Sequence, residues 1–237
     1  MIYAEILAGG SGTRMGNTDR PKQFLMLGNK PILVHTIEAF LLNPRIDRIL
    51  VVVPNVWLDY SKDIMNKYNV YTDRVHLVVG GSTRNETIMN GCRYIESQWG
   101  ITDEDIIVTH DSVRPFITQR IINDNIDACL KYGAVDTVIP AVDTIVESTN
   151  NETITNIPVR KYYYQGQTPQ SFGIAQLTSL YNALTEEEKD ILTDACKIFT
   201  MKGHPVHLVM GEGYNIKITA MYDLKLANAI LEGHLHD

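Results

Sequence analysis

The sequence predicts an α/β fold: a mostly parallel, twisted, doubly wound sheet with helices on both faces. Short β-branched and apolar runs alternate with longer segments of helical periodicity over about the first 140 residues, a pattern typical of strand–helix–strand units. Arg48 to Pro54 (RILVVVP) is almost continuously apolar, as expected of a strand buried on both faces. At 237 residues, the chain is predicted to form a single domain, residues 1–237, with an appendage.

The expected elements follow one another at short intervals. In chain order they are a strand at 2–8, a helix at 31–42, a strand at 48–54, a helix at 56–68, a strand at 75–79, a helix at 83–99, a strand at 105–110, a helix at 117–132 and a strand at 134–142. A helix from Ile174, a strand at 205–210 and a closing helix at 221–231 complete the chain. Glycine-rich or charged stretches follow several strands, and the carboxyl ends of strands are where α/β sheets bind ligands.

The alternation lapses at residues 143–171, which are rich in Thr, Asn and Tyr. The pair Asn150-Asn151 indicates a hairpin turn between two strand-like pieces. The segment has too few apolar residues for a core of its own, so we expect a β-arm that projects from the domain and contacts a second subunit.

Composition narrows the class of protein. The formal net charge of −7 argues against general nucleic-acid binding and against binding to a membrane surface. No apolar run approaches the length of about 18 residues expected of a membrane span. The three cysteines are far apart and show no C-x-x-C spacing, which predicts reduced thiols in a cytoplasmic protein.

The glycine-rich stretch at residues 7–24 (LAGGSGTRMGNTDRPKQF) follows the first strand. Its glycines allow a tight turn and a close approach of the backbone to a ligand. Arg14, Arg20 and Lys22 add positive charge, which predicts a cradle for an anion such as phosphate. The stretch matches neither the G-x-G-x-x-G fingerprint nor the Walker loop, and a purely structural turn stays open.

Three further features invite two interpretations each. The turn at residues 80–87 (GGSTRNET) opens a helix, and it either caps that helix or recognises a base or a phosphate. Asp111 ends a buried strand, and it either binds Mg²⁺ or braces its loop through Arg114. Lys217 lies between two isoleucines, and it is either a solvated lysine or part of a binding site.

Six motifs taken together are more specific: LAGGSGTRMG, PKQF, GGSTRNET, HDSVRP, QGQTPQSF and YNIKIT. In this order, from residue 7 to residue 219, they resemble the cytidylyltransferase family of the IspD/TarI type. The resemblance implies a Rossmann-like nucleotidyltransferase fold, Mg²⁺ or another divalent cation, and a homodimer. It also implies transfer of a cytidylyl group from CTP to a sugar-alcohol phosphate, with release of pyrophosphate.

The resemblance assigns roles to particular residues. It implies that Arg14 and Lys22 stabilise the transition state, that Asp111 binds the metal ion, and that Arg160 and Lys217 are catalytic residues that also bind the acceptor. Asp143 and Thr144 are expected to line the acceptor site. Expected CTP-binding residues are Leu7, Ala8, Gly9, Gly10, Gly81, Ser82, Thr83, Arg84, Asn85, Glu86, Thr87 and Ser112.

The sequence motifs identify the acceptor substrate less firmly than they identify the nucleotide. LAGG and the segment VRKYYYQGQTPQSF resemble the family members that convert D-ribitol 5-phosphate to CDP-ribitol for teichoic acid-type polymers. The glycine loops and the cations do not discriminate, so 2-C-methyl-D-erythritol 4-phosphate remains the alternative. A non-catalytic nucleotide-binding protein is disfavoured by the complete set of cations. A sugar-nucleotide transferase is disfavoured because the Asp-x-Asp match, Asp103 to Asp105, precedes a strand.

Overall fold

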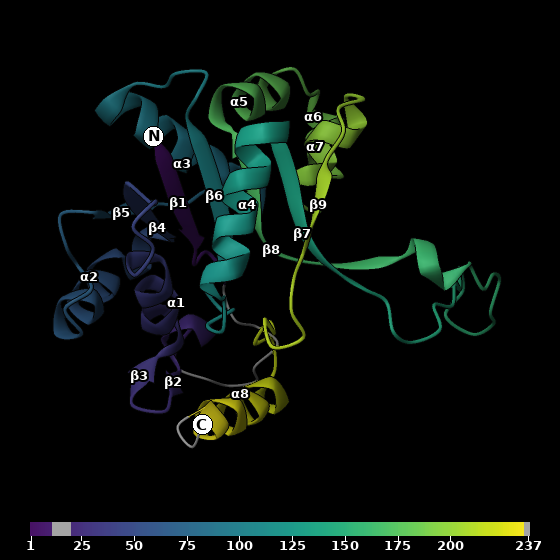
Figure 1. Ribbon diagram of the computed structural model, residues 1–237, viewed down its shortest axis with the longest axis horizontal. Coiled ribbons are helices and arrows are strands. Elements are labelled where there is room, and N and C mark those ends of the chain that lie inside the picture. The colour runs from purple at the N-terminus through teal and green to yellow at the C-terminus, as the bar shows by residue number, and fades with distance from the viewer. Residues whose placement is uncertain (11–19, 235–237) are drawn as a thin grey trace.

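The computed structural model describes residues 1–10 and 20–234, and its centre is a seven-stranded sheet (Figure 1). The strands lie in the order β5 (Val75–Val79), β4 (Arg48–Val53), β1 (Ile2–Leu7), β6 (Ile106–Asp111), β8 (Tyr164–Gly173), β7 (Ala134–Pro140) and β9 (His207–Met210). Strand β8 is antiparallel to both of its neighbours, and the other four pairings in this sheet are parallel. The sheet is therefore mostly parallel, as predicted.

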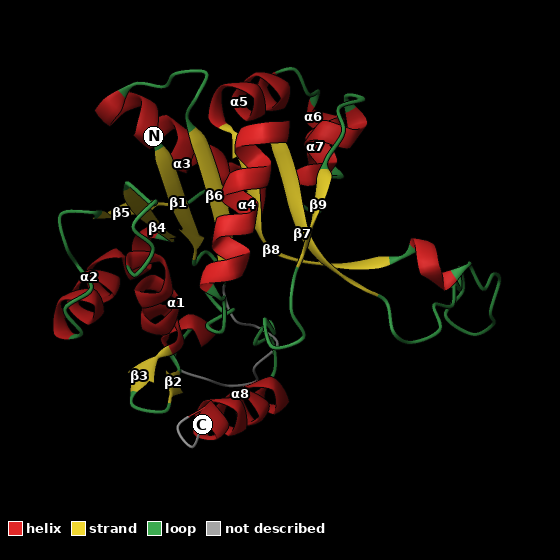
Figure 2. Ribbon diagram, viewed as in Figure 1, coloured by secondary structure: helices red, strands yellow, loops and turns green. Residues whose placement is uncertain are grey.

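Helices cover both faces of the sheet (Figure 2). One face is packed by α1 (Ile32–Leu41), α2 (Leu58–Lys67) and α4 (Gln119–Tyr132), and the other by α3 (Arg84–Trp99), α5 (Ile174–Asn182) and α7 (Cys196–Met201). Along β1, Ala4 and Ile6 belong to the first core, whereas Tyr3 and Leu7 belong to the second. Because successive side chains of a strand point to opposite faces, a continuously apolar run serves both cores, and the doubly wound prediction is confirmed.

Smaller elements close the carboxyl end of the parallel strands. A two-stranded ribbon of β2 (Met26–Leu27) and β3 (Lys30–Pro31) lies beside α8 (Met221–His234). Leu27, Val113, Ile218 and Ala227 share a third apolar cluster there. The remaining short helices are η2 (Lys22–Phe24), η3 (Asn55–Trp57), η4 (Arg160–Tyr162) and α6 (Glu186–Asp190). None of the described helices is long and apolar enough to cross a membrane.

Residues 141–163 extend away from the sheet (Figure 1), with one isolated bridge between Glu147 and Asn156. The expected end of the arm at Ser171 is wrong, because residues 164–171 belong to β8, which inserts between β6 and β7. Buried polar side chains form hydrogen bonds in this strand: the Thr168 hydroxyl with His110 Nδ1, and the Gln170 amide with Asp136. Because Gln167, Thr168, Gln170 and Ser171 are all buried, the strand lacks the continuous apolar pattern that predicts burial.

Candidate functional site

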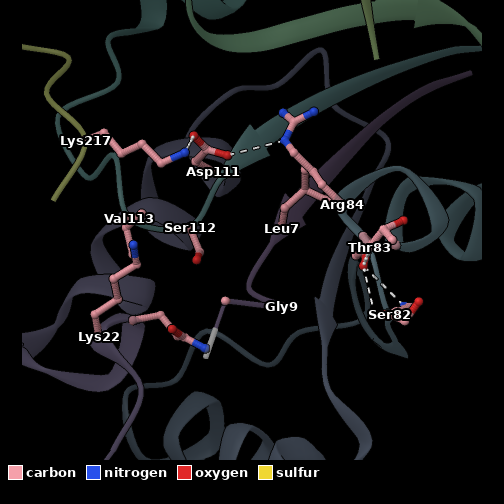
Figure 3. A pocket seen from close by; sticks show the side chains of 14 residues that line it. Leu7, Gly9, Lys22, Ser82, Thr83, Arg84, Asp111, Ser112, Val113 and Lys217 are labelled. Atoms are coloured by element: carbon pink, nitrogen blue, oxygen red, sulfur yellow. Dashed lines mark hydrogen bonds and ion pairs between the residues drawn. The ribbon is translucent and has the colours of Figure 1, made fainter. Parts of the chain in front are cut away.

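A cavity of about 240 Å³ opens at the carboxyl ends of β1 and β6, facing the start of α3 (Figure 3). The strands contribute Leu7 and Asp111, and the cations Lys22, Arg84 and Lys217 come from η2, from the start of α3 and from the loop after β9. The cavity is lined by Leu7, Gly9, Gly10, Lys22, Gln23, Gly81, Ser82, Thr83, Arg84, Thr87, Asp111, Ser112, Val113 and Lys217. The predicted nucleotide loops and Lys217 therefore lie around one cavity, although Lys217 is about 130 residues from the second loop and about 200 from the first.

The amino end of α3 presents its positive pole to the cavity. Thr83 is the N-cap and forms a capping box with Glu86, whose carboxylate also accepts from the backbone N–H of Ser82 at 2.8 Å. A Cβ at Gly81 would overlap Glu86, so the turn requires glycine. The capping interpretation is confirmed, and the capped end also lines the cavity; recognition of a base or a phosphate stays a prediction.

Thr87 connects the turn to the first loop. Its hydroxyl donates to the carbonyl of Thr83 at 2.7 Å and accepts from the N–H of Gly81 at 3.2 Å. A Cβ on Gly9 would lie 3.7 Å from the same hydroxyl. Thr87 thus holds the second glycine turn and lies next to the first glycine stretch.

Gln23 anchors the first loop, and sequence reasoning missed it. Its side chain is buried, and its Nε2 donates to the carbonyl of Ala8 at 2.8 Å. The adjacent Lys22 lines the cavity, with its Cε 3.9 Å from where a Cβ of Gly10 would lie. The motif PKQF contained the signal, but a glutamine next to a lysine is not recognisable as buried from sequence alone.

Asp111 is the electrostatic centre of the site. Its carboxylate lies 2.9 Å from Lys217 Nζ, 3.4 Å from Arg114 Nε and 3.8 Å from Arg84 Nε. Burial acts to raise the pKa of Asp111, but the charges of Arg84, Lys217 and Arg114 hold that pKa well below its ordinary value. Asp111 therefore pairs with Arg114, as one interpretation required, and stays ionised at the cavity wall.

His110, next to Asp111, is neutral. Burial lowers the pKa of His110 to about 4. Its Nε2 lies 3.1 Å from the carbonyl oxygen of Arg114, and because a carbonyl can only accept, Nε2 carries the proton. The unprotonated Nδ1 then accepts a hydrogen bond from the Thr168 hydroxyl at 2.9 Å. The backbone N–H of Asp111 donates to the same hydroxyl at 3.1 Å. The carboxyl end of β6 is thus fastened to β8.

Several predicted site residues lie elsewhere. Arg14 falls outside the described residues. Ala8 and Asn85 are buried and do not line the cavity, and Glu86 is turned towards the capping box. Residues 143, 144 and 160 lie on the projecting segment, away from this cavity (Figure 1). The guanidinium of Arg160 donates to the carbonyl of Val142 at 2.6 Å, within the same segment.

Fold and cavity together define a class of protein. Cations and a helix amino end surround one carboxylate at the carboxyl edge of a parallel sheet, which is an arrangement suited to a nucleotide polyphosphate. The family model for 2-C-methyl-D-erythritol 4-phosphate cytidylyltransferase (IspD) matches residues 2–233. The chain belongs to this cytidylyltransferase family, and it is a CTP-dependent nucleotidyltransferase.

Individual relatives cover almost the whole chain. A ribitol-5-phosphate cytidylyltransferase of Lactiplantibacillus plantarum is 59% identical over 232 residues, which are 98% of this chain and 99% of the relative. The 4-diphosphocytidyl-2C-methyl-D-erythritol synthase of Anaerococcus prevotii has a TM-score of 0.80 at 29% identity, over 98% of this chain and 96% of that one. The IspD structure of Francisella tularensis has a TM-score of 0.79 at 27% identity, over 96% and 98% of the two chains.

Proposed function

We propose that the protein transfers the cytidylyl group of CTP to D-ribitol 5-phosphate, giving CDP-ribitol and pyrophosphate. The observation that carries the choice of acceptor is identity: 59% to a ribitol-5-phosphate enzyme, against 29% to a methylerythritol-type synthase of the same fold. CDP-ribitol would supply teichoic acid-type polymers. We also infer a cytoplasmic location, which the three free, buried cysteines support.

The chemistry requires positioning and charge neutralisation. A phosphate oxygen of the acceptor attacks the α-phosphorus of CTP, a new phosphorus–oxygen bond forms, and the bond to pyrophosphate breaks. A phosphate monoester has a second pKa of about 6, so it is mostly a dianion at neutral pH and needs no general base. Two polyanions must meet, so cations are needed on both sides of the reacting phosphorus.

The cavity supports a division of labour among its cations. Lys22 lines the cavity, and Arg14 belongs to the same glycine-rich stretch of the sequence; we assign both to the triphosphate. Lys217 comes from the loop after β9 and points towards Asp111 (Figure 3), and we assign it to the acceptor phosphate. Charge placed on both sides of the transferring group stabilises the transition state more than it stabilises either substrate.

Asp111 is the residue that would hold Mg²⁺. Among the described residues, no group of three His, Cys, Asp or Glu side chains could bind a metal ion unaided. Mg²⁺ nevertheless commonly binds through one or two carboxylates together with substrate phosphates, and the ionised carboxylate of Asp111 in the cavity wall fits that pattern. When bound, the ion would neutralise charge on the triphosphate.

We further propose that a second copy of the chain completes the acceptor site through residues 143, 144 and 160. Val142, Ile154, Ile157, Val159 and Tyr162 are all more than half exposed on the projecting segment. Apolar exposure of this extent on one segment is typical of an interface. With Arg160 supplied by a partner, each site would have acceptor-binding cations from two chains.

Mixed dimers test this arrangement. Arg160→Ala and Lys217→Ala variants should each lose acceptor use, while CTP binding is spared. After co-refolding by random mixing, about half of the dimers should be heterodimers, and each heterodimer would contain one intact site and one doubly mutated site. The mixture should therefore recover about one quarter of wild-type activity. If heterodimers identified by their mass showed no recovery of activity, the proposal of a site shared between two chains would be contradicted.

The substrate assay is direct. Purified protein with Mg²⁺ and CTP is offered D-ribitol 5-phosphate and 2-C-methyl-D-erythritol 4-phosphate in parallel, and both pyrophosphate and the CDP product are measured. We expect CDP-ribitol with a clear preference in kcat/KM. A preference for methylerythritol phosphate would replace the proposed acceptor, and lack of pyrophosphate with both would remove the proposed function.

A further inference from the structure

Lys217 lies in a loop, residues 211–219, which forms neither helix nor strand. Its side chain is 42% exposed, so its own ion pair with Asp111 can contribute little to holding it in place. The backbone of the loop must therefore be held by other residues. Two buried amides do this, and neither has a role in the function proposed above.

Asn215, two residues before Lys217, is fully buried. Its Nδ2 donates twice to β8, to Gln167 Oε1 at 3.1 Å and to the carbonyl of Thr168 at 2.8 Å. The carbonyl of Asn215 accepts from Arg114 Nη1 at 2.7 Å. Asn215 thus joins the Lys217 loop to β8 and to the arginine that pairs with Asp111.

Gln167 holds the start of the same loop. Its Nε2 donates to the carbonyl of Glu212 at 2.9 Å, while its Oε1 accepts from Asn215. A Cβ at Gly211 would overlap Gln167 Oε1, so a side chain where the loop leaves the sheet would displace this amide. Beyond Lys217, the N–H of Ile218 donates to the carbonyl of Val113 at 2.9 Å. The loop is therefore fixed on both sides of Lys217.

We propose that Asn215, supported by Gln167, is a positioning residue that holds Lys217 at the acceptor side of the cavity. The inference rests on the proposed role of Lys217 in binding the acceptor phosphate. Loss of the two donated hydrogen bonds frees the loop, and a displacement of about 1 Å in a positioned group can cost roughly 100-fold in rate. The effect falls on the acceptor, because the CTP-facing turns are held by Thr87 and Gln23 instead.

A buried asparagine that matters only for folding is the competing explanation, and the chain offers a matched control for it. Asn125 is equally buried, and its Nδ2 also donates twice, to the carbonyl of Ile121 at 3.0 Å and to the Thr137 hydroxyl at 2.8 Å. It lies between α4 and β7 and does not line the cavity. Truncating either asparagine removes two donated buried hydrogen bonds, and truncating Asn125 also removes the one that its Oδ1 accepts from the Ser171 hydroxyl at 3.1 Å. Asn125→Ala is therefore at least as severe a change, but only Asn215 is next to Lys217.

The experiment is a pair of double-mutant cycles on the full chain with CTP, Mg²⁺ and D-ribitol 5-phosphate. We expect Asn215→Ala to lower kcat/KM for the acceptor roughly 10- to 100-fold, with the KM for CTP within about 2-fold of wild type. In a Lys217→Ala background, Asn215→Ala should cost less than about 3-fold, because the positioned group is gone. Asn125→Ala should leave acceptor kcat/KM within about 2-fold in either background. Melting temperatures measured alongside ensure that all variants are assayed folded.

The outcomes separate this inference from the proposed function. Equal losses from Asn215→Ala with and without Lys217 would overturn the positioning role, as would an equal loss from Asn125→Ala or an equal rise in the KM for CTP. A Lys217→Ala variant with normal acceptor use would overturn both the role of Lys217 and the inference built on it. Failure of the wild-type protein to form CDP-ribitol would instead be failure of the proposed function.

Discussion

Asp111→Asn should destabilise the protein strongly, quite apart from its effect on activity. The side chains of Asp111 and Arg114 are each only 10% exposed, and Arg84 is 26% exposed. Neutralising the carboxylate leaves a buried guanidinium without a counter-charge. Breaking a buried pair in this way costs about 3–5 kcal/mol of unfolding free energy, which is a large share of the total of about 5–15 kcal/mol typical of a domain.

The third partner of Asp111 should behave differently. Lys217 is 42% exposed, and solvent screens an ion pair at that exposure to about 1 kcal/mol or less. Lys217→Ala should therefore remove acceptor use while changing the unfolding free energy by no more than about 1 kcal/mol. The contact of Asp111 with the buried Arg114 thus matters for stability, whereas its contact with the more exposed Lys217 matters for the chemistry.

Urea denaturation near neutral pH measures the unfolding free energies of both variants. Urea is uncharged, so it adds no salt that would screen the ion pairs. Asp127→Asn is the control, because Asp127 pairs with Arg45 at exposures of 67% and 35% and should cost less than about 1 kcal/mol. The reasoning is refuted if Asp111→Asn costs no more than Asp127→Asn, or if Lys217→Ala costs as much as Asp111→Asn.

Three further predictions concern the loop cation and two buried acids. Lys22→Ala should lower kcat roughly 100-fold, as loss of an oxyanion donor does, and steady-state turnover near that of wild type would contradict its transition-state role. Gly91→Ala should cost about 1–3 kcal/mol in urea denaturation, because its Cβ would overlap the buried Glu5 carboxyl. The cost should shrink in a Glu5→Ala background, and an unchanged cost there would count against this clash. Burial raises the pKa of Asp136 to about 6, so this group stabilises the native state below its unfolded pKa of about 4 and loses that contribution as the pH rises through 6. Asp136→Asn should therefore be more stable than wild type by roughly 1–3 kcal/mol near pH 8 and about equal near pH 4, and a pH-independent difference would disprove the assignment.

The positions of most elements follow from local pattern. The run RILVVVP becomes β4, and residues 83–99 become α3 with Thr83 as its cap, as the capping box predicted. These signals are local: β-branched runs favour strands, and a cap residue satisfies the free N–H groups of the first turn. Strand β8 could not be found in this way, since Gln167, Thr168, Gln170 and Ser171 are buried polar residues. Thr168 and Gln170 hydrogen-bond to side chains of other strands.

By itself the sequence determined most of the strand–helix order and the two glycine turns at the carboxyl ends of strands, because each depends on neighbours within a few residues. Only the tertiary structure decided which side chains meet. Lys217 reaches Asp111, and Asn215 and Gln167 hold its loop, across separations of about 50 to 100 residues. Such pairings depend on strand order and on the burial of individual polar groups, and neither is a property of any local stretch of chain.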